Sequence, residues 1–195
     1  MTRKVQTLLA ELLCGDDERA ELAAGRLAEL SRESLAEVLS LLDSPAADTR
    51  WWAVRTLAQM DKPPIETLIR CAEDENEEVR QCGILALVYH PDARAVPCLM
   101  NNLMDSEPVT VNLAASALIE IGSPAVPALL SLPGDAPHAS RVESVRALAS
   151  IADERAIPAL MKALDEDSPA LHYWSEHGLE KLGLGMVYMK TSGTT

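Results

Sequence analysis

The sequence contains no phenylalanine and has only three tryptophans and three tyrosines among its 195 residues. Its apolar fraction is nevertheless an ordinary 48%, and Ala and Leu supply most of it. This composition excludes a core built around large aromatic rings. It suits helices that pack closely against one another.

Long apolar runs and paired cysteines are absent as well. No run approaches the roughly 20 residues that a membrane-spanning helix needs. The basic and then apolar start, MTRKVQTLLAELLCGDDE, is interrupted by Gln6 and Glu11, so it predicts an amphipathic helix rather than a signal peptide. The four cysteines form no CxxC pair, so we interpret them as reduced thiols. We therefore expect a cytoplasmic protein with no membrane partner.

Positive charge is scarce. The chain has 17 Lys and Arg against 30 Asp and Glu, which gives a net charge of −13. Binding to nucleic acid requires a basic surface, and an anionic membrane attracts one. The charge balance therefore argues against both kinds of partner.

What the sequence does contain is an internal repeat. In the stretch RWWAVRTL, Arg50 is followed by a small residue, Ala53, and then by Leu57. A small residue four positions before a leucine recurs in steps of 30 or 31 residues. The six leucines of this pattern are Leu27, Leu57, Leu87, Leu118, Leu148 and Leu179.

The segments between these motifs also match one another. AVPCLMNNLMD, AVPALLSLPGD and AIPALMKALDED each begin near a proline, which is tolerated in the first turn of a helix. Each unit is therefore predicted to contain two short helices, A and then B. In the fifth unit, SLPGDAPHAS introduces Pro133, Gly134 and Pro137, so we expect that A helix to end early.

Residues typical of helix ends fall between the predicted helices. Ser44-Pro45 and Ser168-Pro169 are each interpreted as an N-cap followed by proline at the first helical position. Gly122 and Gly183 are expected to end two B helices. The polar segment KTSGTT is interpreted as a tail.

The combined pattern VR…A…LG…AVPAL…L.D resembles HEAT repeats, and it is closest to the short bacterial form named after phycobilisome lyases. The resemblance implies an all-α fold, a right-handed α-α superhelix (solenoid) of six HEAT-like helix pairs. We expect one repeat domain over residues 1–183 and a C-terminal tail over 184–195. The predicted repeats are 3–31, 32–61, 62–91, 92–122, 123–152 and 153–183.

One face of the B helices is not needed for the core. At 100° per residue, the small residue and the leucine share one stripe, and the positions one, two, five and nine after the motif arginine lie opposite. In HEAT-like solenoids the B helices line the concave surface, so the resemblance makes this face a groove. The candidate binding residues on it are Trp51, Arg55, Leu85, Tyr89, Arg146, Tyr173 and His177.

The adjacent tryptophans are expected to differ in burial. Trp51 and Trp52 point about 100° apart on a helix, so they cannot enter the same core. We expect Trp51 to be exposed beside Arg55 and Trp52 to be covered by a neighbouring repeat. Packing between repeats and contact with a partner both remain open as roles for Trp52 and Trp174.

The motif arginines are predicted to be structural. They lie about 40° from the centre of the core stripe. Acidic residues or carbonyl groups of the A–B turns are the expected partners, forming a ladder along the stack. The ladder would consist of Arg50, Arg80 and Arg141 with Asp43, Asp74 and Asp135.

No catalytic, metal-binding or cofactor-binding motif is present. His172 and His177 are five apart, and HYWSEH is not the zinc motif HExxH. Acidic clusters at 15–18, 73–78 and 165–167 fall in A–B turns. Carboxylates there stabilise the start of the following helix and keep the protein soluble. The alternative interpretation is that they recruit a basic partner.

These features favour a non-catalytic scaffold whose concave groove binds a segment of another protein; the oligomeric state stays open. The alternative is a bilin-lyase-type enzyme or tetrapyrrole chaperone. In that alternative, aromatic rings of Trp51, Tyr89 and Tyr173 would stack on the tetrapyrrole, and Arg55 or Arg146 would pair with its propionates. A HEAT-like DNA glycosylase is a remote alternative, which the net charge of −13 disfavours.

Overall fold

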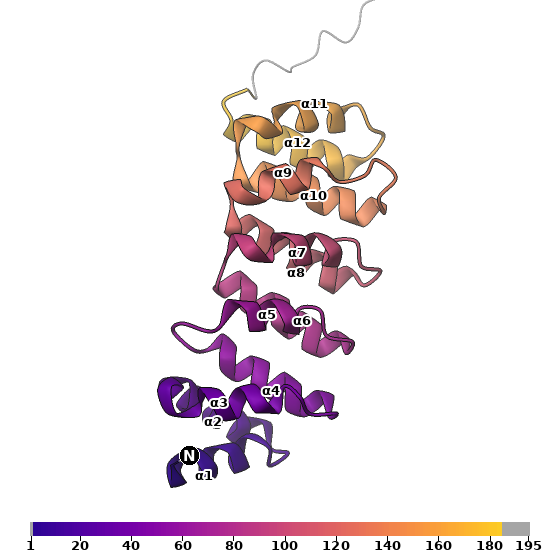
Figure 1. The fold of residues 1–195 in the computed structure, drawn as a ribbon. Helices are drawn as coiled ribbons and strands as arrows, with labels where there is room; N and C mark the ends of the chain where they lie inside the picture. Colours follow the sequence, from indigo (N-terminus) through magenta and orange to yellow (C-terminus); the bar gives the residue numbers. More distant parts are fainter. Residues whose placement is uncertain (1, 185–195) are drawn as a thin grey trace, which may run out of the picture. The chain divides into compact units, whose positions relative to one another are not determined.

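A computed structural model describes residues 2–184 of the chain (Figure 1). Within these residues every regular element is helical and no strand occurs, so the prediction of an all-α fold is confirmed. The chain divides into two compact units, Met1–Asp92 and Ala93–Thr195. Each unit is described separately below. The single repeat domain over residues 1–183 stays a prediction, and KTSGTT lies outside the described residues.

Unit 1 contains six helices, drawn from indigo to magenta in Figure 1. The first helix of each pair packs against the second, and the second helices pack against one another in order: α2 on α4, and α4 on α6. The helices are α1 (Arg3–Leu12), α2 (Asp17–Glu29), α3 (Ser31–Leu41), α4 (Ala47–Ala58), α5 (Ile65–Cys71) and α6 (Glu77–Tyr89).

Unit 2 repeats this arrangement, and each of its first helices is preceded by one turn of 3₁₀ helix (η). Its second helices also pack in order, α8 on α10 and α10 on α12. The elements are η1 (Ala93–Ala95), α7 (Val96–Asn102), α8 (Pro108–Ile121), η2 (Ser123–Ala125), α9 (Val126–Leu130), α10 (His138–Ile151), η3 (Glu154–Ala156), α11 (Ile157–Leu164) and α12 (Pro169–Lys181).

No single helix among residues 2–184 is both long enough and apolar enough to span a membrane. Taken together, α8 and the segment Ser123–Leu130 have the length and apolar composition of a span, although the chain bends by 117° between them.

Side chains cap several of these helices. The side chain of Ser168 accepts a hydrogen bond from the Leu171 N–H, which confirms the predicted N-cap of α12. The prediction at Ser44 is wrong, because α4 begins at Ala47 and its N-cap is Ala46. The Ser44 hydroxyl instead accepts from the Ala46 N–H, and the carbonyl groups of Ser44 and Pro45 accept from Arg50.

The core follows the predicted stripe. Relative exposure is zero for Leu57, Leu87 and Leu118 and 2% for Leu148, so the predicted burial of these four leucines is confirmed. The small residues of the motif are buried as well, and they let neighbouring helices approach closely. The fifth A helix, α9, has five residues and ends before Pro133, as predicted.

Ala152 ends α10 in a left-handed conformation, with φ 55° and ψ 45°. It is the only non-glycine residue with positive φ in the described chain. The side chain of alanine is strained there, and glycine is the preferred residue after a helix. We expect Ala152→Gly to raise the free energy of unfolding by about 0.5–1 kcal/mol, measured by urea denaturation. Ala152→Val serves as the opposing variant and should lower it.

Candidate functional site

The predicted groove positions lie on the second helices of each unit, and their burial varies widely. Tyr89 and Tyr173 are 67% and 62% exposed, whereas Leu85, Arg55 and His177 are half-buried. Leu22, at the position equivalent to Trp52, is 64% exposed. The burial expected for Trp52 therefore does not extend to the equivalent position of the first repeat. In α2 the position two after the motif residue faces solvent.

The adjacent tryptophans form a perpendicular pair on α4. Their ring centroids are 4.8 Å apart and the ring planes make an angle of 89°. Trp52 is 7% exposed and packs with Ala20, Ala23 and other core residues of unit 1. Trp51 is half-buried rather than fully exposed, because it packs against apolar residues on both of its sides.

An open pocket with a volume of about 420 Å³ borders the tryptophan pair. It is lined by Asp17, Glu21, Asp48, Trp51, Trp52 and Glu78. The tryptophans were singled out from the sequence, but Asp17, Asp48 and Glu78 were not. One signal was available: two positions before the motif residue, the first three repeats carry Glu18, Asp48 and Glu78.

The sequence predicted Arg55 as a binding residue beside Trp51. In the structure, Arg55 is instead bound to a carboxylate of its own chain. Its guanidinium group donates two hydrogen bonds to the carboxylate of Glu21, at 2.6 and 3.0 Å. The Gln59 amide donates to the same carboxylate. This network joins α4 to α2 beside the pocket. The Arg55 guanidinium group is therefore already bound to a carboxylate of the same chain.

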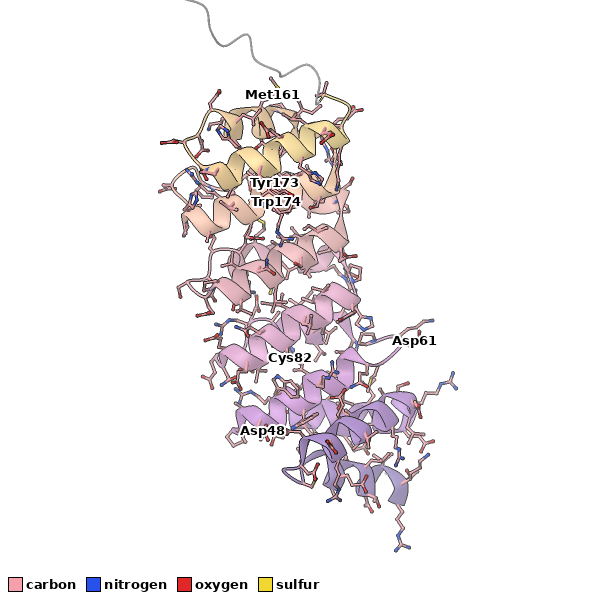
Figure 2. The ribbon with its side chains drawn as sticks, turned by 180° about the vertical axis from the view of Figure 1, so that it is seen from behind. Asp48, Asp61, Cys82, Met161, Tyr173 and Trp174 are labelled. Atoms are coloured by element: carbon pink, nitrogen blue, oxygen red, sulfur yellow. The ribbon has the colours of Figure 1, made fainter. Side chains whose placement is uncertain are left out.

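Unit 2 has its own aromatic cluster, on α12. The ring of Tyr173 is perpendicular to that of Trp174 and nearly parallel to that of His177, with centroid distances of 5.0 and 6.3 Å. Figure 2 shows Tyr173 and Trp174 on the side of α12 that is turned toward α10. On α10, the Arg146 guanidinium group forms an ion pair with Glu143. The two arginines proposed for propionates, Arg55 and Arg146, are therefore both paired with carboxylates.

The predicted arginine ladder has a different set of partners. Arg50 binds Asp74 through two hydrogen bonds at 2.7 and 2.8 Å, and Arg80 donates to the carbonyl oxygen of Asp74. Asp43, expected as a partner, is exposed and is not among the residues bound by Arg50. The reason is geometric. The A–B turn of its own repeat supplies carbonyl groups to Arg50, and the A–B turn of the next repeat supplies the carboxylate.

Arg141 repeats this pattern in unit 2. It donates to the carbonyl oxygen of Gly134 in its own turn and forms an ion pair with Glu166 in the next. The expected partner, Asp135, is exposed and receives neither bond. Arg50 and Arg141 therefore each bind carbonyl groups of their own turn and a carboxylate of the next turn.

The Arg50–Asp74 pair is expected to make stability depend on pH. Hydrogen bonding to Arg50 holds the pKa of Asp74 below its ordinary value. A carboxyl with a lowered pKa in the folded state stabilises the fold above its unfolded pKa of about 3.9, and this stabilisation is lost as pH falls through the folded pKa. We expect Asp74→Asn to lower the free energy of unfolding near pH 7 by about 2 kcal/mol.

The variant and the parent should converge in acid, because the parent then also carries an uncharged side chain at this position. Urea denaturation at several pH values between about 7 and 3 would measure the difference. Asp43→Asn is the matched control, since Asp43 occupies the equivalent turn but is exposed. A difference between Asp74→Asn and the parent that stays constant down to the lowest pH would contradict the assignment.

Two buried thiols are poor nucleophiles. Burial raises the pKa of both Cys71 and Cys82 to about 12, so neither is a thiolate near neutral pH. Cys82 lies two positions after Arg80, which is a position of the predicted groove face, and it is 8% exposed. Figure 2 labels its position on α6. In residues 2–184, no group of three His, Cys, Asp or Glu side chains is arranged to hold a metal ion.

Curated relatives come from cyanobacteria. The bilin biosynthesis protein RpcF of Synechococcus sp. (strain WH8020) is 41% identical over 91 residues, which are 46% of this chain and 44% of that protein. The phycocyanobilin lyase subunit beta of Nostoc sp. (strain PCC 7120 / SAG 25.82 / UTEX 2576) is 35% identical over 101 residues, 51% of this chain and 50% of that protein. The chain thus spans about half the length of the curated relatives it matches.

Solved structures support the fold. An engineered protein matches with a TM-score of 0.57 and 20% identity over 93% of this chain and 99% of its own. A designed armadillo repeat protein matches with a TM-score of 0.51 and 17% identity, over 91% of this chain and 99% of the designed protein. At these identities the similarity shows the helical-repeat fold and carries no argument about function.

A family model connects the fold to the sequence. The model described as HEAT repeats matches residues 5–81, 33–119, 65–141 and 101–180, so its overlapping matches run through both units. The helix pairs and the repeated small-residue and leucine pattern are the features expected of such repeats. The chain therefore belongs to the HEAT-repeat family.

Proposed function

We propose that this chain is a binding subunit of the bilin-lyase type, which holds a partner protein on the exposed face of its second helices. The observation that carries the proposal is its similarity to a protein named phycocyanobilin lyase subunit beta. A subunit of that kind acts together with another polypeptide. A third relative, 37% identical over 73 residues, is named a phycobilisome maturation protein.

The chemistry of the described residues supports binding rather than covalent catalysis. Cys71 and Cys82 are protonated near neutral pH, because burial raises the pKa of each to about 12. The exposed face, in contrast, offers the exposed rings of Tyr89 and Tyr173 and the half-buried ring of Trp51, and tyrosine and tryptophan anchor many protein interfaces. The carboxylates around Trp51 disfavour nucleic acid as the partner, since they would repel phosphate groups.

The proposal is tested by mixing the purified chain with the alpha subunit of a phycocyanobilin lyase and measuring complex formation by analytical ultracentrifugation. We expect a complex with a dissociation constant of about 1 μM or tighter, as is typical of a specific interface. If the chain sediments alone at concentrations well above that value, the proposal is wrong.

Holding a bilin is a second candidate function, and the aromatic cluster on α12 favours it. Tyr173, Trp174 and His177 present three neighbouring rings, and Tyr173 is 62% exposed. Stacking on such rings is a common way to hold a conjugated planar ligand. If this function is correct, adding the chain to phycocyanobilin should shift the visible absorption band, and Tyr173→Leu should weaken the shift. An unchanged spectrum would contradict it.

A further inference from the structure

Three of the carboxylates at the tryptophan pocket lack an internal counter-ion. The carboxylate of Glu21 is bound by Arg55 and Gln59. Asp17, Asp48 and Glu78 are exposed, and within residues 2–184 none of them forms an ion pair with a cationic side chain. The pocket therefore carries net negative charge next to two indole rings.

Helix stability alone does not explain these carboxylates. They lie in the first turns of α2, α4 and α6, where negative charge interacts favourably with the helix dipole. Yet α8, α10 and α12 form without any acidic residue in the first turn. Two positions before the motif residue, these later helices carry Val109, Ala139 and Ala170. The carboxylates are thus confined to the unit that contains the tryptophan pocket.

Trp52 adds a hydrogen-bond donor to the pocket. It lines the pocket although it is only 7% exposed. Its indole N–H makes no hydrogen bond within residues 2–184 and is not among their buried polar atoms without a partner, so it is open to solvent. A polypeptide seated in the pocket could accept a hydrogen bond from it through a backbone carbonyl group.

We propose that the pocket between α2, α4 and α6 binds an arginine side chain of a partner polypeptide. The planar guanidinium group stacks on Trp51 and pairs with Asp48 and Glu78, and a carbonyl oxygen of the same segment accepts a hydrogen bond from Trp52. Arginine fits better than lysine, because it stacks on aromatic rings and is more weakly hydrated. The inference rests on the proposed binding function and names the chemistry of the partner at this site.

The same charges exclude another occupant. A tetrapyrrole carries propionate groups, and these would face Asp17, Asp48 and Glu78 across the pocket. Like charges in such proximity disfavour binding. A bilin held by this chain therefore belongs elsewhere, and α12 is the candidate already described.

The test uses two short peptides, acetyl-Gly-Arg-Gly-Arg-Gly-amide and the same peptide with citrulline in place of arginine. Citrulline keeps the shape of the side chain but removes its charge. The indole N–H signals of Trp51 and Trp52 are followed by NMR, after assignment with Trp→Phe variants. We expect saturable shifts with the arginine peptide, weakening of its binding in about 0.5 M salt, and no shifts with citrulline. Equal shifts with both peptides, or none with arginine up to about 10 mM, would overturn the proposal.

Variants locate the site. Asp48→Asn combined with Glu78→Gln should weaken arginine-peptide binding by about 10-fold, since both ion pairs are lost. Glu77→Gln is the matched control for the single change Glu78→Gln: it removes one negative charge from the same helix turn, but Glu77 does not line the pocket, so binding should change by less than about 2-fold. Equal effects of the two single changes would show general charge attraction and no site. Circular dichroism checks that each variant is folded.

The outcomes separate this inference from the proposed function. If the lyase alpha subunit binds but the arginine peptide does not, the arginine site is wrong and the proposed function stands. If the peptide binds at Trp51 and Trp52 but the alpha subunit does not, the pocket is a cation-binding site and the proposed function is wrong.

Discussion

Gly83→Ala is expected to lower the free energy of unfolding by about 3 kcal/mol, because the added methyl group has no room. A Cβ atom at Gly83 would lie 2.5 Å from the backbone nitrogen of Ala72 and 2.6 Å from the carbonyl carbon of Cys71. Both are backbone atoms of the segment that ends α5, so relief requires α5 and α6 to separate. The loss should appear as a lower urea midpoint and a lower Tm.

Gly25→Ala provides the control for this prediction. Gly25 also lies inside a second helix, α2, but its added Cβ would meet only the side-chain oxygen of Gln59, at 3.3 Å. That side chain can move, and alanine is favoured over glycine within a helix, so stability should rise by about 0.5–1 kcal/mol. If both substitutions stabilise the protein, the close approach of α5 and α6 at Gly83 is wrong.

Leu87→Ala is expected to cost about 2–5 kcal/mol, the range observed when a fully buried leucine is truncated. Leu87 has no exposed surface and occupies the leucine position of the repeat in α6. The cost combines lost apolar burial with the cavity that remains, and it is a large share of the roughly 5–15 kcal/mol that stabilises a domain. Chemical denaturation followed by circular dichroism measures it.

Leu22→Ala is the matched control, because it makes the same chemical change on α2 at a side chain that is 64% exposed. Its effect should stay within about 0.5 kcal/mol. Similar losses for Leu22→Ala and Leu87→Ala would show that the assignment of core and surface positions on the second helices is incorrect.

The sequence by itself determined the repeat and the buried stripe. A small residue and a leucine at a fixed spacing in each unit define one face of a helix, and helical geometry then places both in the core. For this reason Leu57, Leu87 and Leu118 could be assigned as buried, and they are fully so. The helix wheel also separated Trp52 from Trp51, since adjacent residues on a helix must point in different directions.

Only the tertiary structure decided which turn supplies each partner and how closely helices approach. Arg50 was equally compatible with Asp43 and Asp74, and the stacking of repeats brings Asp74 to it. Position 83 required only a small residue by pattern, as at Ala53, but the separation of α5 and α6 requires glycine. Likewise, Asp48 and Glu78 meet at Trp51 because α4 and α6 pack side by side. Such contacts join residues of different helices that lie far apart in the sequence, so they depend on packing distances that a local periodicity does not contain.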